Sequence, residues 1–214
     1  MKSVAIGAHL LRDDVEPLAS ATVVGDLFLS AVEVADDQPL GDRELLLRVA
    51  DVRARLLDVA TFVAIRYGFT FTSAADAHAR CAAHLARWQR LLTEHRSRVE
   101  MTLKVAAASA LPRPDRREFT SGADYLRALH AATQSASVDP AFREQAERLI
   151  ASPSARHRWI HRDERSVELA ALIDRERVDD VLRAGEELRR AAPAVPFLLS
   201  GPWPLEVFAD DSDE

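Results

Sequence analysis

The sequence has a single cysteine, Cys81, in 214 residues, so no disulfide bond can form within the chain. A lone thiol agrees with a reducing compartment. No apolar run approaches the ~20 residues that a membrane-spanning helix needs, and the N-terminal residues lack the layout of a signal peptide. We therefore expect a cytoplasmic protein that makes no membrane contact.

Short motifs of known chemistry are also missing. The chain has no glycine-rich phosphate loop, no dinucleotide fingerprint, no nucleophile elbow and no His-Glu-x-x-His zinc motif. Gly68 stands alone, so residues 66–72 would cradle a phosphate poorly and indicate a turn instead. The residues by themselves indicate no active site and no cofactor.

A basic surface for nucleic acid is not expected either. The net charge is -6, whereas proteins that bind nucleic-acid phosphates usually present a basic face. The one local basic cluster is Arg113, Arg116 and Arg117, and we interpret it as a solvated loop.

Two groups of possible metal ligands fail on spacing. His78, Cys81 and His84 lie in a helical pattern, where steps of three residues spread them over roughly 120° of the surface. His157 and His161 lie in a predicted strand, which separates their side chains by about 13 Å. Neither group can converge on one ion, so we expect no bound metal.

The middle of the chain has the clearest pattern. Residues 59–65 form an apolar run that is typical of a buried strand. Ser73 and Asp76 have the spacing of a helix-capping box, and the apolar stripe that follows predicts a helix ending near His95. Residues 98–107 alternate between apolar and polar, as in a half-buried strand. Together these elements predict a βαβ unit.

The preceding residues predict a small α+β domain over residues 1–58. Residues 3–8 are a strand candidate, and two strand-like runs flank Gly25 and Asp26, which suggests a hairpin or a bulge. A helix follows, with one apolar stripe made of Leu45, Val49, Val52 and Leu56.

The following residues predict a ferredoxin-like domain over residues 59–209 with inserted helices at 120–152. Ser121 and Asp139 are the expected N-caps of the inserted helices. Strands are expected at 156–160 and 165–173, a helix at 175–190 and a buried last strand at 195–199. Lys104 and Glu168 are expected to form a cross-strand ion pair.

The last residues are expected to behave in two ways. Gly201–Phe208 contains two prolines, and we expect it to dock on the protein as a rigid, irregular segment that buries Trp203 and Phe208. Residues 210–214, DDSDE, are expected to be a disordered acidic tail.

Four stretches of the chain resemble the gas vesicle synthesis protein family GvpL/GvpF. They are AIRYGFTF (64–71), VEMTLKV (99–105), SGADYL (121–126) and GPWPLEVF (201–208). The sequence departs from the family pattern at Ala64, Tyr67, Phe69 and residues 205–207. The positions that we treat as motif residues are Arg66, Tyr67, Gly68, Glu100, Lys104, Gly122, Tyr125, Leu126, Gly201, Pro202, Trp203, Pro204 and Phe208.

The resemblance implies an N-terminal α+β domain followed by a modified ferredoxin-like domain with a helical extension. It also implies a non-catalytic accessory protein of gas vesicle formation. Such a protein would bind the small hydrophobic shell protein and other gas vesicle accessory proteins in the cytoplasm. The motif residues are then structural, and Arg66 is expected to find a carboxylate or carbonyl partner that joins the two domains.

Three alternatives remain open at this point. The first alternative is an enzyme or a small-ligand sensor on a ferredoxin-like scaffold, which hosts many functions. The second is a divergent family member that serves another assembly. Within the gas vesicle role, Trp203 is either buried or an exposed anchor for the shell protein.

Overall fold

The computed structural model describes residues 1–10, 20–109, 111–151, 156–163 and 165–209. The chain divides into two compact units, each with its own sheet. Unit 1 comprises Met1–Val99 and Trp203–Glu214, and unit 2 comprises Glu100–Pro202. Both units mix helices with antiparallel strand pairs, which confirms the predicted α+β class.

The sheet of unit 1 has five strands. They are β1 (Lys2–Leu10), β2 (Ser20–Val24), β3 (Leu27–Val34), β4 (Phe62–Ala64) and β5 (Thr70–Phe71). The order is β2-β3-β1-β4, and β5 also pairs with β1. Val24 pairs with Leu27, so β2 and β3 form the predicted hairpin, and Gly25 supplies the positive φ of +64° that such a tight turn requires.

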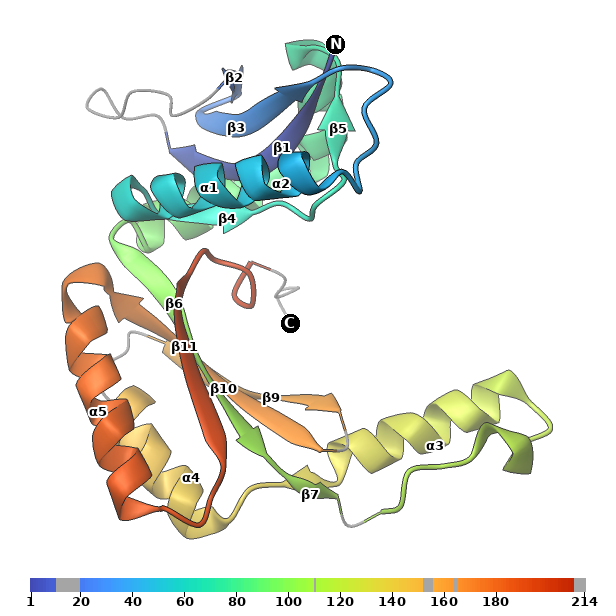
Figure 1. The fold of residues 1–214 in the computed structure, drawn as a ribbon, viewed down its shortest axis with the longest axis vertical. Coiled ribbons are helices and arrows are strands. Elements are labelled where there is room, and N and C mark those ends of the chain that lie inside the picture. The colour runs from blue at the N-terminus through green and yellow to red at the C-terminus, as the bar shows by residue number, and fades with distance from the viewer. Residues whose placement is uncertain (11–19, 110, 152–155, 164, 210–214) are drawn as a thin grey trace. The chain divides into compact units, whose positions relative to one another are not determined.

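Two helices flank this sheet, α1 (Arg43–Val59) and α2 (Ala74–Glu94) (Figure 1). The Asp42 side chain caps α1, and the Ser73 hydroxyl caps α2 by accepting from the Asp76 amide, as the sequence predicted. The predicted apolar stripe of α1 is its buried face. Six consecutive residues of β1 are buried, which requires cover on both faces of the strand because successive side chains alternate.

Unit 2 has a four-stranded sheet in the order β11-β6-β10-β9. Its strands are β6 (Arg98–Ala106, beginning in unit 1), β9 (Arg156–Asp163), β10 (Ser166–Asp174) and β11 (Phe197–Trp203, ending in unit 1). The chain order is strand, helices, strand, strand, helix, strand, and the third strand lies between the first and the second. This is a ferredoxin-like strand order, the type of domain that the sequence predicted, although its first strand differs from the predicted one.

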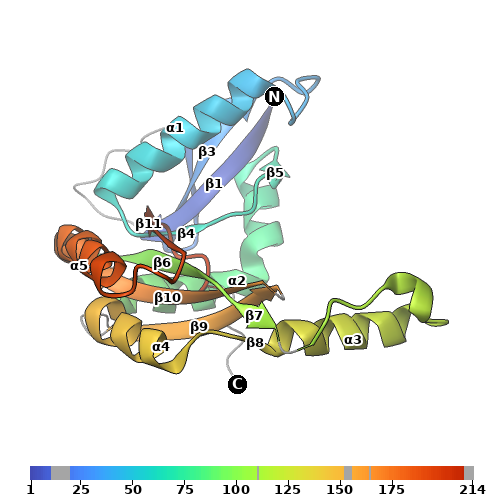
Figure 2. The same cartoon turned by 60° about the horizontal axis from the view of Figure 1, so that its bottom comes forward.

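The helices of unit 2 are α3 (Gly122–Gln134), α4 (Pro140–Ala146), which continues into a π-helical turn at Glu147–Ala151, and α5 (Val178–Ala191). A short strand pair, β7 (Ala108–Ser109) and β8 (Ala136–Ser137), closes the base of α3. The core joins α4, the π turn and α5 to the inner face of the sheet, with Met101, Leu103 and Val105 fully buried. In both views α3 extends away from this sheet (Figures 1 and 2).

The division between the units differs from the predicted boundary between residues 58 and 59. Within the apolar run at 59–65, Val59 ends α1 and Phe62–Ala64 forms β4, which pairs antiparallel with β1 in unit 1. A βαβ unit needs both strands in one sheet, but β4 and β6 lie in different sheets. The ferredoxin-like order therefore starts at β6, and the predicted inserted helices are its first crossover.

Candidate functional site

The motif residues separate into two groups, one in each unit. Unit 1 holds Arg66, Tyr67 and Gly68, which follow β4, together with the C-terminal positions Trp203, Pro204 and Phe208. Unit 2 holds the motif positions of β6, α3 and the end of β11, which are Glu100, Lys104, Gly122, Tyr125, Leu126, Gly201 and Pro202.

In unit 1 the C-terminal segment closes the free edge of β4. The Leu205 amide donates to the Phe62 carbonyl at 2.9 Å, and the Ala64 amide donates to the Leu205 carbonyl at 3.2 Å. Leu205 and Phe208 are buried, at 0% and 2% exposure. Two stretches that are far apart in sequence are thus joined by backbone hydrogen bonds.

Trp203 and Phe208 do not share one environment. Phe208 docks in unit 1, as predicted for this segment, whereas Trp203 is 47% exposed. Residues 201–203 belong to β11, where an irregular segment was predicted, although the φ of Gly201 is +130°. The predicted tail at 210–214 lies outside the described residues.

The two motif stretches of unit 1 meet at a hollow of about 380 Å³. The residues that line it are Arg53, Ala64, Ile65, Arg66, Tyr67 and Glu206. Arg53, on α1, donates through Nη2 to the Ile65 carbonyl at 3.1 Å, and its Nη1 lies 3.9 Å from a carboxylate oxygen of Glu206. No sequence pattern drew attention to Arg53, since it lies on the polar side of an ordinary amphipathic helix.

Arg66 was expected to have a carboxylate or carbonyl partner, and the structure contradicts this. Its side chain is exposed, and within the described part of the chain its guanidinium makes no hydrogen bond or ion pair. Full solvation removes the cost of leaving an arginine unpaired, so no partner is required. The Tyr67 hydroxyl, in contrast, donates to the Leu40 carbonyl.

Tyr67 remains a neutral phenol, because burial, and then the nearby Asp42 carboxylate, raise its pKa. Gly68 has φ of +94° and nothing within 4 Å of a built Cβ, so the turn after β4 needs glycine for its backbone angle alone.

In unit 2, Gly201 is fixed by close packing as well as by its backbone. Its φ is +130°, and a Cβ there would lie 2.6 Å from Met101 Sδ and 2.9 Å from the Glu100 carbonyl. The neighbouring Glu100 is a buried residue of β6. The motif glycine of the last strand is therefore required where β11 approaches β6.

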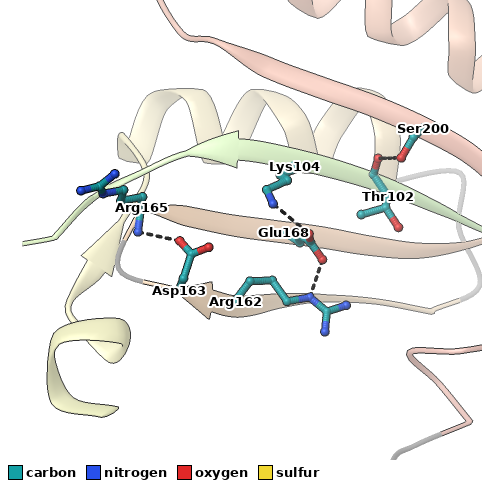
Figure 3. A network of polar contacts seen from close by, with 7 residues as sticks. All are labelled: Thr102, Lys104, Arg162, Asp163, Arg165, Glu168 and Ser200. Atoms are coloured by element: carbon teal, nitrogen blue, oxygen red, sulfur yellow. Dashed lines mark hydrogen bonds and ion pairs between the residues drawn. The ribbon is translucent and has the colours of Figure 1, made fainter. Parts of the chain in front are cut away.

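A polar network lies on the sheet face opposite α4 and α5 (Figure 3). Glu168 on β10 is 13% exposed and binds two cations: Arg162 Nε at 2.5 Å and Lys104 Nζ at 4.0 Å. This confirms the predicted pair between Lys104 and Glu168. Nearby, the Arg165 amide donates to Asp163, and this bond is the main reason why the pKa of that carboxyl is lowered. The network has the features of a structural ion-pair cluster.

The motif positions of α3 differ in exposure. Ser121 caps the helix through the Ala123 amide, and Asp124 pairs with Arg127 instead of completing the predicted capping box. The Tyr125 ring packs edge-on against Phe119 at 5.9 Å. Leu126, however, is 62% exposed, and Gly122 is exposed at the helix start.

The last strand was predicted to be buried, but β11 is the edge strand of its sheet. Leu198 is 60% exposed, and among the described residues no strand pairs with the outer edge of β11. A continuous apolar run resembles a strand covered on both sides, and the sequence gives no signal for strand order. This edge is therefore a feature that sequence reasoning missed.

Shallow hollows lie on both sides of β11. The first hollow lies on the sheet face that carries the ion-pair network. It is lined by Lys104, Ala106, Asp163, Arg165, Ser166, Pro196, Phe197 and Leu198. The second hollow lies between β11 and α5. It is lined by Leu182, Arg183, Gly185, Glu186, Arg189 and Leu199. Leu182 is 40% exposed in this second hollow.

The histidine and cysteine candidates do not form a site. Cys81 is buried at 1% exposure, and burial raises the pKa of its thiol. His78 and His84 are exposed, and His157 and His161 lie in β9 as predicted. Among the described residues, no three His, Cys, Asp or Glu side chains gather closely enough to hold a metal ion. In the described part of the chain, no helix is both long enough and apolar enough to cross a membrane.

Comparisons with known proteins point to one family. The sequence profile described as "Gas vesicle synthesis protein GvpL/GvpF" matches residues 16–209. The crystal structure of gas vesicle protein GvpF from Microcystis aeruginosa superposes with a TM-score of 0.67 at 10% identity, covering 98% of this chain and 99% of that chain. The GvpF structure from Anabaena sp. PCC7120 gives 0.66 at 11% identity, covering 99% of both chains. No curated protein is significantly similar in sequence.

Proposed function

Because the chain belongs to the GvpL/GvpF family of gas vesicle synthesis proteins, we propose that it is a non-catalytic assembly protein that binds the small hydrophobic shell protein. The family match spans most of the chain and implies a role in gas vesicle formation. The proposed place of action is the cytoplasm, at the gas vesicle, together with other accessory proteins. A shell subunit that will bury apolar surface needs protection from aggregation before it is incorporated.

The observation that carries this proposal is the open edge of β11. A strand at the end of a sheet presents backbone N–H and C=O groups to any extended segment that arrives. Recognition by strand addition gains affinity from these main-chain hydrogen bonds and specificity from pockets for alternate side chains. Leu198, at 60% exposure, adds an apolar contact near the start of the edge strand.

The hollows on either side of β11 suit an added strand. Successive side chains of a strand point to opposite faces, so an incoming segment would place one side chain toward Leu198 and the next toward Leu182. Gly185 brings α5 close to the strand, because a Cβ there would collide with the Leu199 side chain. Both hollows contain apolar side chains, which fits a hydrophobic partner segment.

The alternative of an enzyme has less support. A catalytic nucleophile or base needs a pKa tuned toward neutrality in an accessible site. The Cys81 thiol and Tyr67 phenol instead have raised pKa values that keep them protonated, and Cys81 is buried. The pKa of Glu147 is lowered, first of all by the hydrogen bond from Trp159 Nε1, which is a structural contact.

A matched pair of variants tests the proposal. We expect Leu198→Lys to weaken co-purification of the co-expressed shell protein at least tenfold, because a lysine in the apolar centre of the interface must be desolvated. Leu126→Lys on α3 changes an equally exposed leucine outside the edge and should bind normally. Equal binding by wild type and Leu198→Lys would reject β11 as the docking edge.

A further inference from the structure

The hollow in unit 1 has a surplus of positive charge in a chain whose net charge is negative. Two of its six lining residues are arginines, Arg53 and Arg66, and one is a carboxylate, Glu206. Since the Tyr67 phenol keeps its proton, it adds no negative charge at neutral pH. The hollow is therefore complementary to an anion.

Arg53 is held in place, yet its hydrogen-bonding capacity is not filled. The bond from Nη2 to the Ile65 carbonyl at 3.1 Å fixes the guanidinium against the chain that follows β4. The Glu206 carboxylate lies 3.9 Å from Nη1, which is beyond hydrogen-bond distance. The Nε–H is buried and has no acceptor among the described residues. A guanidinium has five N–H donors in a fixed fork, and since Nε is buried, an entering carboxylate would bind at Nη1, beside Glu206.

Arg66 provides the second cation without losing an existing interaction. Its side chain is exposed, and within the described residues it has neither an ion pair nor a hydrogen bond to give up. A carboxylate that enters the hollow therefore gains a contact to Arg66 at no cost in broken protein contacts. Pre-positioning of Arg53 also lowers the entropy that binding must overcome.

We propose that this hollow is a carboxylate-binding site that receives an Asp or Glu side chain of a partner polypeptide. Arg53 and Arg66 would contact the carboxylate through charge-assisted hydrogen bonds, and the Tyr67 ring would form a side of the site. The site lies in unit 1 and is separate from the β11 edge, so it holds or fails independently of the proposed shell-protein docking.

The shape of the hollow favours a side chain over a free small molecule. Small-molecule sites usually enclose most of the surface of their ligand. Six residues line this hollow, and two of its charged side chains, Arg66 and Glu206, are exposed to solvent. It can cover the tip of an acidic side chain while the rest of the partner lies on the surface outside.

The test is an NMR titration of the full chain at constant ionic strength, observed at the backbone amides of residues 65–68. The probe is a blocked Gly-Asp-Gly-Asp-Gly peptide, compared with the matching Gly-Asn-Gly-Asn-Gly peptide. A third arm uses sodium acetate at the same carboxylate concentration. The titration is repeated on a chain that ends at Ala209, because the acidic C-terminal residues would otherwise compete with the probe.

We expect saturable shifts with the aspartate peptide only, and Arg66→Gln should weaken binding about tenfold, as for one charge-assisted hydrogen bond. Arg55→Gln is the matched control, because Arg55 lies on α1 outside the hollow and pairs with Asp51. Absent shifts, or equal binding by Arg66→Gln and wild type, would overturn the site. Acetate binding as tightly as the peptide would overturn the assignment to a partner polypeptide.

Discussion

The edge at β4 in unit 1 and the edge at β11 in unit 2 are treated in opposite ways. In unit 1 the C-terminal segment bonds to β4 through Leu205, and the side chain of that leucine is fully buried. In unit 2 the edge strand β11 has no further strand beside it among the described residues, and Leu198 is mostly exposed.

The difference shows where the chain leaves room for a partner. Proteins usually cover, charge or shorten a sheet edge, because an open edge pairs with other chains. Unit 1 covers the edge of β4 with its own C-terminal residues. Unit 2 leaves the edge strand β11 with an exposed leucine near its start, which is a feature expected of a docking surface and not of a purely structural unit.

The largest expected effect comes from removing the anchor of the closed edge. Phe208→Ala should lower the free energy of unfolding of unit 1 by about 3–5 kcal/mol, because it deletes a fully buried ring. Trp203→Ala should cost clearly less, since Trp203 is 47% exposed. Urea denaturation followed by circular dichroism compares the two. A larger loss from Trp203→Ala would contradict this description of the closed edge.

The next effect concerns the approach of β11 to β6 in unit 2. Gly201→Ala should destabilise unit 2 by about 3 kcal/mol or more, because backbone strain adds to a collision with Met101 and the Glu100 carbonyl. Gly68→Ala is the control in unit 1, where only the backbone angle is unfavourable, and should cost roughly 1–2 kcal/mol. If thermal unfolding shows a larger loss of stability for Gly68→Ala than for Gly201→Ala, the packing of Gly201 against β6 is not tight.

The stability of unit 1 should also depend on pH through a buried histidine. His9 on β1 is 3% exposed, is hydrogen-bonded to Ser30 Oγ at 2.9 Å and stacks on Phe28. Burial lowers the pKa of His9, so below the ordinary value of about 6.5 the unfolded chain binds a proton that the folded chain does not.

Unit 1 should therefore keep full stability above about pH 6.5 and lose at most about 1.4 kcal/mol per pH unit below it, until the folded-state pKa is reached. His9→Gln should flatten this slope. Hydrogen exchange of β1 amides at several pH values gives the measurement, and an unchanged slope in His9→Gln would assign the effect to another group.

The smallest effect is expected at the open edge. Leu198→Lys should change the stability of unit 2 by no more than about 0.5 kcal/mol, as for other exposed positions. Leu205→Lys is the counterpart at the closed edge and should unfold unit 1 or cost several kcal/mol, because it buries an unpaired charge. Similar melting temperatures for the two variants would remove the contrast between the edges.

Local patterns predicted most elements of the fold. The cap at Ser73, the hairpin at Gly25 and the alternation of residues 98–106 each depend on neighbouring residues, and each is present in the structure. The helix start at Asp139 and Pro140 is present for the same reason.

The pairing of strands that are far apart in the sequence was harder to predict from local patterns. Nothing in residues 59–65 distinguishes a strand that pairs with β1 from one that begins the second sheet, and the choice depends on contacts such as that between Gly7 and the Phe62 ring. For the same reason β11 could not be recognised as an edge. Strand order is decided by tertiary packing, which the local pattern does not contain.

The residues of the candidate site could likewise be predicted only in part from the sequence. The motif resemblance identified Arg66, but Arg53 joins the hollow only through the fold, from a helix position with no distinctive neighbours. Glu206 likewise departs from the family pattern and gave no signal by itself.

The most direct test of the central claim is hydrogen exchange of the chain with and without the shell protein. If the shell protein adds to the open edge, the outward-facing amides among residues 197–201 and 203 should exchange quickly in the free chain and become protected in the complex, while residues 62–64 at the closed edge stay unchanged. Binding of the shell protein without any added protection at residues 197–203 would contradict the claim that β11 is the docking edge.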